Sequence, residues 1–133
     1  MKLITRDTDY ALRALCYIAQ KKGAIISVRE LVLKLGIPRP FLRKALQVLN
    51  RKKLLISHKG LGGGFSLLQP AEDISLLRLI EIFQGPFRLN ECTFKKKPCP
   101  RRNYCRLKKR IDKIEAFVAR EVSSITIGGL IRG

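Results

Sequence analysis

Three cysteines lie close together in the C-terminal third of the chain. Cys92, Cys99 and Cys105 follow the spacing C-x6-C-x5-C in a segment that also holds two prolines. Thiolates are ligands of zinc and of iron–sulfur clusters, and a loop without helical constraint lets three of them converge. We therefore predict a metal or iron–sulfur site at these cysteines. Three incidental free cysteines are the alternative, because the spacing is looser than that of paired C-x-x-C motifs.

The same segment supplies no obvious fourth ligand. The single histidine, His58, lies on a predicted strand, where we expect it to be hydrogen-bonded or exposed. Oxygen from Asp9, Asp7, Glu91 or an exogenous molecule would then complete the coordination. Cys16 stands apart from the other cysteines, and we expect it to be a small core residue of the first helix.

Positive charge surrounds the cysteines and extends over the whole chain. Residues 95–110 hold nine Lys and Arg, which favour the thiolate form of a cysteine and can also contact DNA phosphates. Overall, 28 Lys and Arg against 10 Asp and Glu give a net charge of +18. This excess predicts a polyanionic partner, nucleic acid above all. A membrane surface is the rival, but the basic residues are interleaved with helical apolar positions and do not line one amphipathic anchor.

Length and composition limit the class of protein. A chain of 133 residues is expected to form a single compact domain. One histidine, no paired-carboxylate motif and no nucleophile signature argue against an enzyme. The first ten residues turn acidic and polar before any long apolar region, so we expect no signal peptide. No apolar stretch approaches the ~18 residues of a membrane span. We predict a cytoplasmic protein, in which clustered cysteines serve as ligands or redox groups.

Apolar residues at helical spacing predict three short helices in the first half of the chain. The first covers residues 6–22. Ser27 and Glu30 form an S-x-x-E capping box for the second helix, which Gly36 ends. The third begins near Pro40, and its inward positions are Leu42, Ala45, Leu46 and Leu49. Two short helices joined at a glycine are typical of a helix-turn-helix.

The outer face of the third helix and the segment after it form the predicted DNA-binding surface. The outward side chains of the helix are Arg39, Phe41, Arg43, Lys44 and Gln47. A hairpin over Leu54–Leu68 follows, with Lys59 at its tip beside Gly62 and Gly63, which permit close approach to phosphate. This order is typical of a wing beside a recognition helix. A nucleotide-binding loop at GLGGG is the alternative, but the Lys-Ser/Thr of a P-loop is missing.

The second half of the chain contains two further predicted helices. The fourth covers Ser75–Phe83, and the last runs from about Cys105 to Val122. Apolar residues of the last helix are spaced 4, 3 and 4 apart, which is typical of a helix packed on another helix: Leu107, Ile111, Ile114 and Val118. We predict a mainly α fold with a small β-hairpin wing. Residues 1–85 form the winged helix-turn-helix, and residues 86–133 form the cysteine loop and a long dimerisation helix.

Four motifs together resemble one known family. They are TDYALRAL near the N-terminus, IPRPFLRKALQVL in the helix-turn-helix, KGLGGGFSLL in the hairpin, and the three cysteines ending in CRLK. Over nearly its whole length the chain resembles the Rrf-two family of bacterial winged-helix transcriptional regulators. The resemblance implies a homodimer crossed through the long helix, which binds pseudo-palindromic, double-stranded promoter DNA. It also implies a cluster held by Cys92, Cys99 and Cys105, with Asp9 as the best candidate for a ligand from the partner subunit.

Two residues depart from the family pattern. Lys108 stands where some members carry a His ligand three residues after the last cysteine, which favours a 4Fe-4S over a 2Fe-2S cluster. Lys59 stands where members often carry Arg, which weakens a bidentate or minor-groove contact.

We predict a transcriptional regulator, expected to be a repressor, that senses iron–sulfur status, redox state or nitric oxide through the cluster. A zinc- or thiol-switch regulator without iron is the first alternative. A basic RNA- or ribosome-associated zinc protein is the second; it would explain the charge and the cysteines but not the helix-turn-helix and wing.

Overall fold

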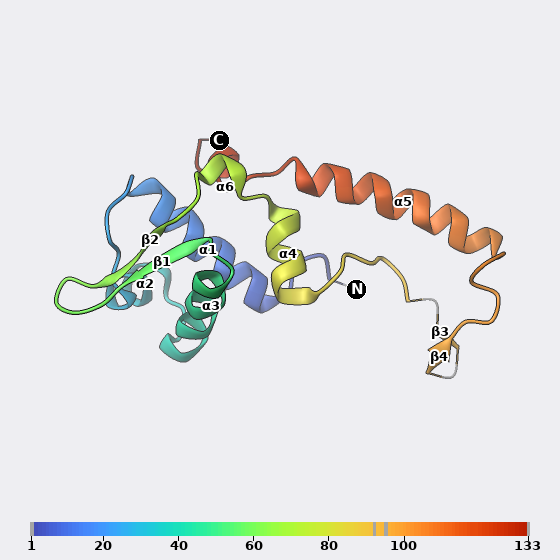
Figure 1. Ribbon diagram of the computed structural model, residues 1–133, viewed down its shortest axis with the longest axis horizontal. Coiled ribbons are helices and arrows are strands. Elements are labelled where there is room, and N and C mark those ends of the chain that lie inside the picture. The colour runs from blue at the N-terminus through green and yellow to red at the C-terminus, as the bar shows by residue number, and fades with distance from the viewer. Residues whose placement is uncertain (1, 92, 95, 133) are drawn as a thin grey trace.

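The chain folds into a winged-helix body with one long helix extending from it (Figure 1). The computed structural model describes residues 2–91, 93–94 and 96–132. In chain order the elements are α1 (Arg6–Gln20), α2 (Val28–Leu35), α3 (Arg39–Arg51), β1 (Leu55–His58), β2 (Gly64–Leu67), η1 (Ala71–Asp73), α4 (Leu76–Gln84), β3 (Thr93–Phe94), β4 (Lys97–Pro98), α5 (Arg106–Ser123) and α6 (Ile127–Arg132). The predicted fold class, mainly α with a small β-hairpin wing, is confirmed.

Helix α1 runs through the centre of the winged-helix core. It packs against α3, α4 and α6, and Ala11, Ala14 and Leu15 are fully buried. Helix α3 contributes the four residues predicted to face inward, Leu42, Ala45, Leu46 and Leu49. The first helix is two residues shorter than predicted, since Lys22 and Gly23 after it have positive φ angles of 44° and 84°.

The helix-turn-helix forms where it was predicted. The Ser27 hydroxyl accepts a 3.0 Å hydrogen bond from the Glu30 N–H and so caps α2. The Glu30 carboxylate accepts instead from the Tyr17 hydroxyl at 2.6 Å, so the second half of the capping box is replaced by a link to α1. Gly36 ends α2 in the left-handed conformation, with φ at 68°, which lets the chain turn directly into α3.

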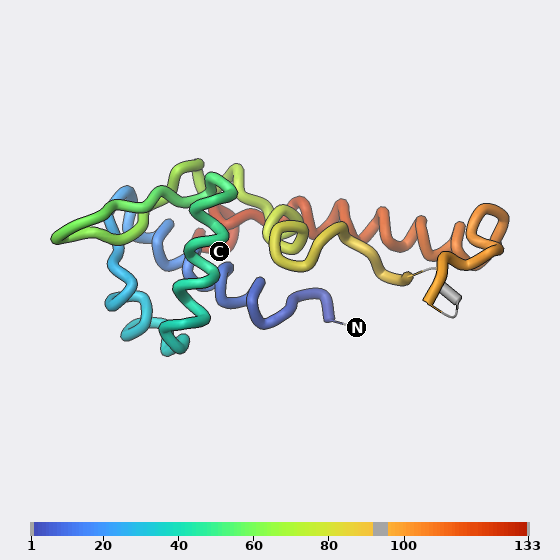
Figure 2. Tube along the Cα trace, turned by 60° about the horizontal axis from the view of Figure 1, so that its bottom comes forward, coloured from blue at the N-terminus to red at the C-terminus, as the bar shows by residue number. Residues whose placement is uncertain are grey.

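The wing consists of β1, β2 and the turn between them, residues 55–67. The strands pair antiparallel from Leu55 opposite Leu67 to His58 opposite Gly64. The wing is anchored to the segment before α2, because Phe65 and Ile26 exchange backbone hydrogen bonds of 2.8 and 2.9 Å. At Gly64 an added Cβ would lie 2.2 Å from the Ile26 carbonyl oxygen, so only glycine fits. Two views show the wing projecting away from the body (Figures 1 and 2).

The chain ends by returning to the winged-helix core. Helix α6, which the sequence analysis did not predict, packs against α1 and η1. Ile127 at its start is fully buried, and its N–H donates to the Ile74 carbonyl at 2.9 Å. The core therefore includes residues beyond position 85, where the predicted DNA-binding domain ends. A second, smaller cluster joins Leu76 and Ile80 of α4 to Val122 of α5.

Candidate nucleic-acid interface and cysteine loop

A groove of about 460 Å³ lies between α3 and the wing. Arg43 and Gln47 line it from α3, and Lys59 lines it from the wing. Gly63 lies on the same wall, as part of the glycine-rich turn. The structure thus brings four of the residues predicted to bind DNA to one concave surface, although they come from two separate segments.

The remaining outward residues of α3 lie on more than one side of the helix. All five predicted residues, Arg39, Phe41, Arg43, Lys44 and Gln47, are exposed. Phe41 and Lys44, however, line a small pocket with Asp7 of α1, away from the groove. The Arg6 guanidinium lies 4.4 Å from the centre of the Phe41 ring, which is a cation–π contact. Phe41 therefore links α3 to the start of α1.

Two groove residues were missed by the sequence analysis as DNA contacts. Asn50 lines the groove three residues after Gln47 and seven after Arg43, so helical spacing alone would have placed it on this face. His58 also lines the groove, and its Nε2 lies 2.9 Å from the Ser66 hydroxyl on the paired strand. The expectation that His58 is hydrogen-bonded on the hairpin is confirmed.

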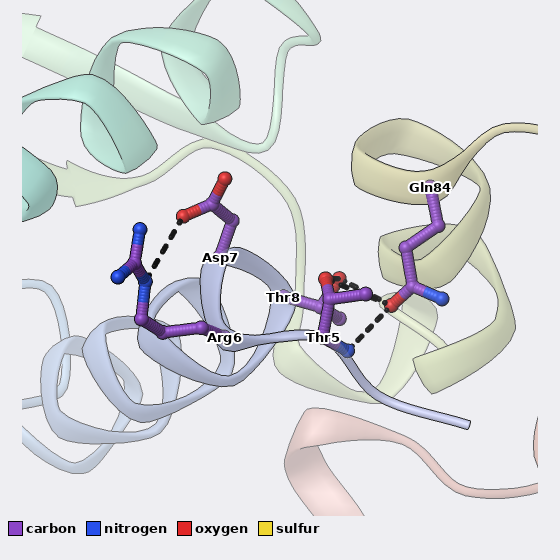
Figure 3. Close-up of polar contacts among 5 residues, drawn as sticks. All are labelled: Thr5, Arg6, Asp7, Thr8 and Gln84. Atoms are coloured by element: carbon purple, nitrogen blue, oxygen red, sulfur yellow. Dashed lines mark hydrogen bonds and ion pairs between the residues drawn. The ribbon is translucent and has the colours of Figure 1, made fainter. Parts of the chain in front are cut away.

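A polar cluster fastens the start of α1 to the end of α4 (Figure 3). The Gln84 side-chain oxygen accepts hydrogen bonds from the Thr5 N–H at 3.0 Å and the Thr8 hydroxyl at 2.7 Å. Its side-chain nitrogen donates to the Leu3 carbonyl at 3.2 Å. Thr8 is fully buried. The chain leaves α4 at Gly85 and continues toward the cysteines. The polar cluster therefore ties the start of this cysteine-containing segment to α1.

Asp9, the predicted fourth ligand, lies on the first turn of α1. Its carboxylate accepts a 2.9 Å hydrogen bond and ion pair from Arg13 Nε, one turn further along the helix. The start of α1 and the β3–β4 hairpin are well separated in both views (Figures 1 and 2). Within one chain the fold does not bring Asp9 to the described cysteines of the loop, so a ligand role requires a partner subunit.

The cysteine loop, residues 86–105, joins α4 to α5. Cys99 and Cys105 are half-buried, and between them the Arg102 N–H donates to the Cys99 carbonyl at 3.1 Å in a compact turn. Cys105 caps α5, where its Sγ accepts a hydrogen bond from the Lys108 N–H at 3.4 Å. Cys92 lies outside the described residues. Among the residues that are described, no three His, Cys, Asp or Glu side chains are grouped closely enough to hold a metal ion.

The structure also shows a short hairpin in the cysteine loop and the surroundings of Cys16. Part of the predicted loop is a short hairpin, in which Thr93 pairs with Pro98 and Phe94 with Lys97. Cys16 packs against the winged-helix core as predicted, and burial raises the pKa of its thiol.

A family model described as Rrf2, iron-dependent transcriptional regulator, matches residues 4–133. The chain belongs to the Rrf2 family. A candidate HTH-type transcriptional regulator of Aquifex aeolicus is 35% identical over 98 residues, which cover 73% of this chain and 68% of that protein. The HTH-type transcriptional regulator NsrR of Oceanobacillus iheyensis is 30% identical over 131 residues, which cover 97% of this chain and 89% of NsrR.

The fold of the chain is also similar to that of a solved structure. CymR, the global cysteine regulator of B. subtilis, superposes with a TM-score of 0.79 at 22% identity, over 99% of this chain and 98% of CymR. The Rrf2 relatives are transcriptional regulators and not enzymes, as predicted. This Rrf2 protein is accordingly a transcriptional regulator. No helix within the described ranges is long and apolar enough to cross a membrane.

Proposed function

We propose that this Rrf2 protein is a homodimeric repressor that binds pseudo-palindromic, double-stranded promoter DNA through α3 and the wing. The groove between these elements carries the proposal, because Arg43, Gln47 and Lys59 converge on it. Arginine and glutamine side chains pair with guanine and adenine edges in the major groove, and lysine contacts phosphate. Exposed Arg39, Phe41, Lys44 and Gly62 would add DNA contacts outside the groove.

The charge of the chain supports a nucleic-acid partner. A net charge of +18 on 133 residues produces a strongly positive field, which speeds encounter with DNA. The uncharged walls of the groove, Val28 and the wing glycines among them, let the backbone approach closely. Position on DNA is then fixed by phosphate contacts, and sequence preference by the α3 side chains.

An exposed apolar face on α5 supports the homodimer. Leu107, Ile114 and Phe117 are 66%, 55% and 56% exposed in the single chain, and Ile111 and Val118 are half-buried. Apolar side chains repeated at this spacing are stable when a second helix covers them. A second copy of α5 would provide that cover. The two α3 helices of the dimer would then be related by a two-fold axis, which matches the symmetry of a pseudo-palindromic operator.

The donor set of the cysteine loop fits an iron–sulfur cluster. Cys92, Cys99 and Cys105 would supply three thiolates, and hydrogen bonds such as that from the Lys108 N–H to Cys105 Sγ tune bound sulfur. Asp9 of the partner subunit would supply the fourth ligand of a 4Fe-4S cluster. The family description, iron-dependent transcriptional regulator, supports iron over zinc. The bound cluster would provide a centre that oxidant, nitric oxide or iron shortage alters.

Contacts within the chain offer a route from the cysteine loop to the DNA surface. Gln84 joins the root of the loop to Thr5 and Thr8 at the start of α1. Arg6, next along α1, contacts the Phe41 ring of α3. A shift of the loop would therefore change the position of α1 against the recognition helix, and hence the spacing of the two α3 helices in a dimer.

An absorption spectrum of anaerobically purified protein, with metal analysis, tests the cofactor. We expect a brown protein with charge-transfer bands, and iron and sulfide in equal amounts. A colourless protein that contains zinc would establish the zinc-switch alternative instead. Loss of operator binding on exposure to nitric oxide or air would identify the cluster state that represses.

A further inference from the structure

The end of the molecule opposite the wing carries an unusually dense positive charge. Residues 95–110, here termed the basic end, hold nine of the 28 Lys and Arg, and no Asp or Glu occurs from residue 92 to residue 111. Among its described residues, the exposed cations are Lys96, Lys97, Arg101, Arg102, Arg106, Lys109 and Arg110. They lie on the β3–β4 hairpin, in the turn that follows it and at the start of α5.

The fold leaves most of this charge without a carboxylate partner. In the described part of the basic end, Lys108 pairs with Asp112 at 2.7 Å, and no other cation there lies within 4.0 Å of a carboxylate. Cations crowded on one surface repel each other, which costs free energy unless an external anion compensates. The three thiolates of the proposed cluster site would balance at most three of the nine charges. The basic end therefore carries more positive charge than the three thiolates could neutralise.

Within one chain the basic end is also remote from the groove between α3 and the wing. Helix α5 has 18 residues and spans about 27 Å, and it separates the cysteine loop from the winged-helix body. Both views place the wing and the β3–β4 hairpin at opposite ends of the elongated chain (Figures 1 and 2). The face of one subunit that holds an operator half-site therefore does not include the basic end.

We propose that the basic end is a second, sequence-independent contact for the phosphate backbone of duplex DNA. This inference rests on the proposed function, in that the chain binds DNA at all. Duplex DNA carries one negative charge per ~1.7 Å and is the polyanion that such a regulator meets. The phosphates come from one of two sources: the flanks of the bound operator, or a separate duplex segment that the regulator would then bridge.

Two matched variants isolate the basic end. The first removes three of its exposed cations: Lys97→Gln, Arg101→Gln and Lys109→Gln. The control removes three exposed cations elsewhere: Lys21→Gln, Arg78→Gln and Arg120→Gln. Each triple variant removes three positive charges and keeps all cysteines, so the two variants have the same net charge and differ in where the charge is removed.

The salt dependence of binding to a random-sequence duplex tests the contact itself. Each phosphate contact contributes about 0.9 to the slope of log K against log salt concentration. We expect the basic-end variant to lose about 2 to 3 from this slope, and the control variant to keep the parent slope. Equal slopes in the two variants would overturn the proposal. Because no operator is involved, this result is independent of sequence recognition by α3.

A second experiment separates the two sources of phosphate. Parent protein is bound to an operator duplex with short or long random flanks, and a labelled random duplex is then added. Tighter binding to the operator with long flanks indicates that the phosphates come from the same duplex. Capture of the labelled duplex indicates that they come from a second segment. Either effect must disappear in the basic-end variant and persist in the control variant. Absence of both effects in the parent would refute the proposal. Tighter binding of a hairpin RNA, lost in the same variant, would reassign the surface to RNA.

Discussion

The Thr8 hydroxyl donates a 2.7 Å hydrogen bond to the Gln84 side-chain oxygen, across 76 residues of sequence. Thr8 is fully buried, so its hydroxyl has no water to replace this acceptor. The same oxygen accepts a hydrogen bond from the Thr5 N–H at 3.0 Å (Figure 3). One carboxamide thus fixes the start of α1 to the end of α4, where the cysteine loop begins.

Replacement of Gln84 by alanine should destabilise the protein measurably. The buried Thr8 hydroxyl and the Thr5 N–H would both lose their acceptor, and we expect a loss of about 1–3 kcal/mol in the free energy of unfolding. Urea denaturation followed by circular dichroism measures this loss. Gln20→Ala, at an exposed position of α1, is the control and should stay within about 0.5 kcal/mol of the parent. Similar losses in both variants would show that the polar cluster does not stabilise the fold.

Asp9→Ala should make the proposed cluster more labile. This variant would remove the proposed carboxylate ligand from the partner subunit, so we expect an altered visible spectrum after anaerobic reconstitution and faster bleaching in air. Because Asp9 also pairs with Arg13 at 2.9 Å, Arg13→Ala serves as the control for loss of the ion pair alone. An effect shared equally by the two variants, or absent from both, would remove Asp9 from the ligand set and leave Glu91, Asp7 or an external ligand.

A charge on the apolar face of α5 should break the proposed homodimer. Ile114 is 55% exposed in the single chain, and Ile114→Glu would place a carboxylate where a partner helix would pack in that dimer. Sedimentation velocity should show monomer for this variant at concentrations where the parent is a dimer. Ala116→Glu adds the same charge at an exposed position on the opposite side of the helix, and should remain dimeric. A dimeric Ile114→Glu protein would place the dimer interface elsewhere.

Cys16 should react slowly with alkylating agents in the native protein. Burial raises the pKa of its thiol, so at pH 8 less of it is thiolate than in the unfolded chain. By linkage, burial penalises the thiolate, so the fold keeps its full stability below the unfolded pKa and loses stability as the pH rises from there through the folded pKa. Iodoacetamide labelling followed by mass spectrometry gives the rate at Cys16 in native and in urea-unfolded protein. Equal rates in the two states would contradict a half-buried thiol of reduced reactivity.

Much of the fold follows from local sequence patterns. The four inward residues of α3, the cap at Ser27 and the turn at Gly36 are all set by neighbours within one or two helical turns, and the structure agrees with each. Helix α6 was missed because its six residues include two glycines, which favour coil; burial of Ile127 in the core outweighs that preference.

The rest depends on contacts between distant segments. Nothing near Gln84 in sequence indicates that it accepts hydrogen bonds from Thr5 and Thr8, which lie 79 and 76 residues away. In the same way, helical spacing placed Phe41 on the outer face of α3, but only the packing of α1 shows that Arg6 covers its ring. The contacts that join α4 to α1 and α1 to α3 could therefore not be predicted from local sequence.

Selection of bound duplexes from a random-sequence pool tests recognition of DNA by α3 most directly. For the parent protein we expect an inverted repeat, with half-site centres separated by about 34–36 Å or a multiple of that distance. Arg43→Ala should weaken the base preference at one position in each half-site and weaken operator binding by about 1–3 kcal/mol. The control variant Lys21→Ala, at an exposed site outside the groove, should select the same motif as the parent. A motif without two-fold symmetry, or the unchanged motif selected by Arg43→Ala, would contradict base recognition by Arg43 in a dimer.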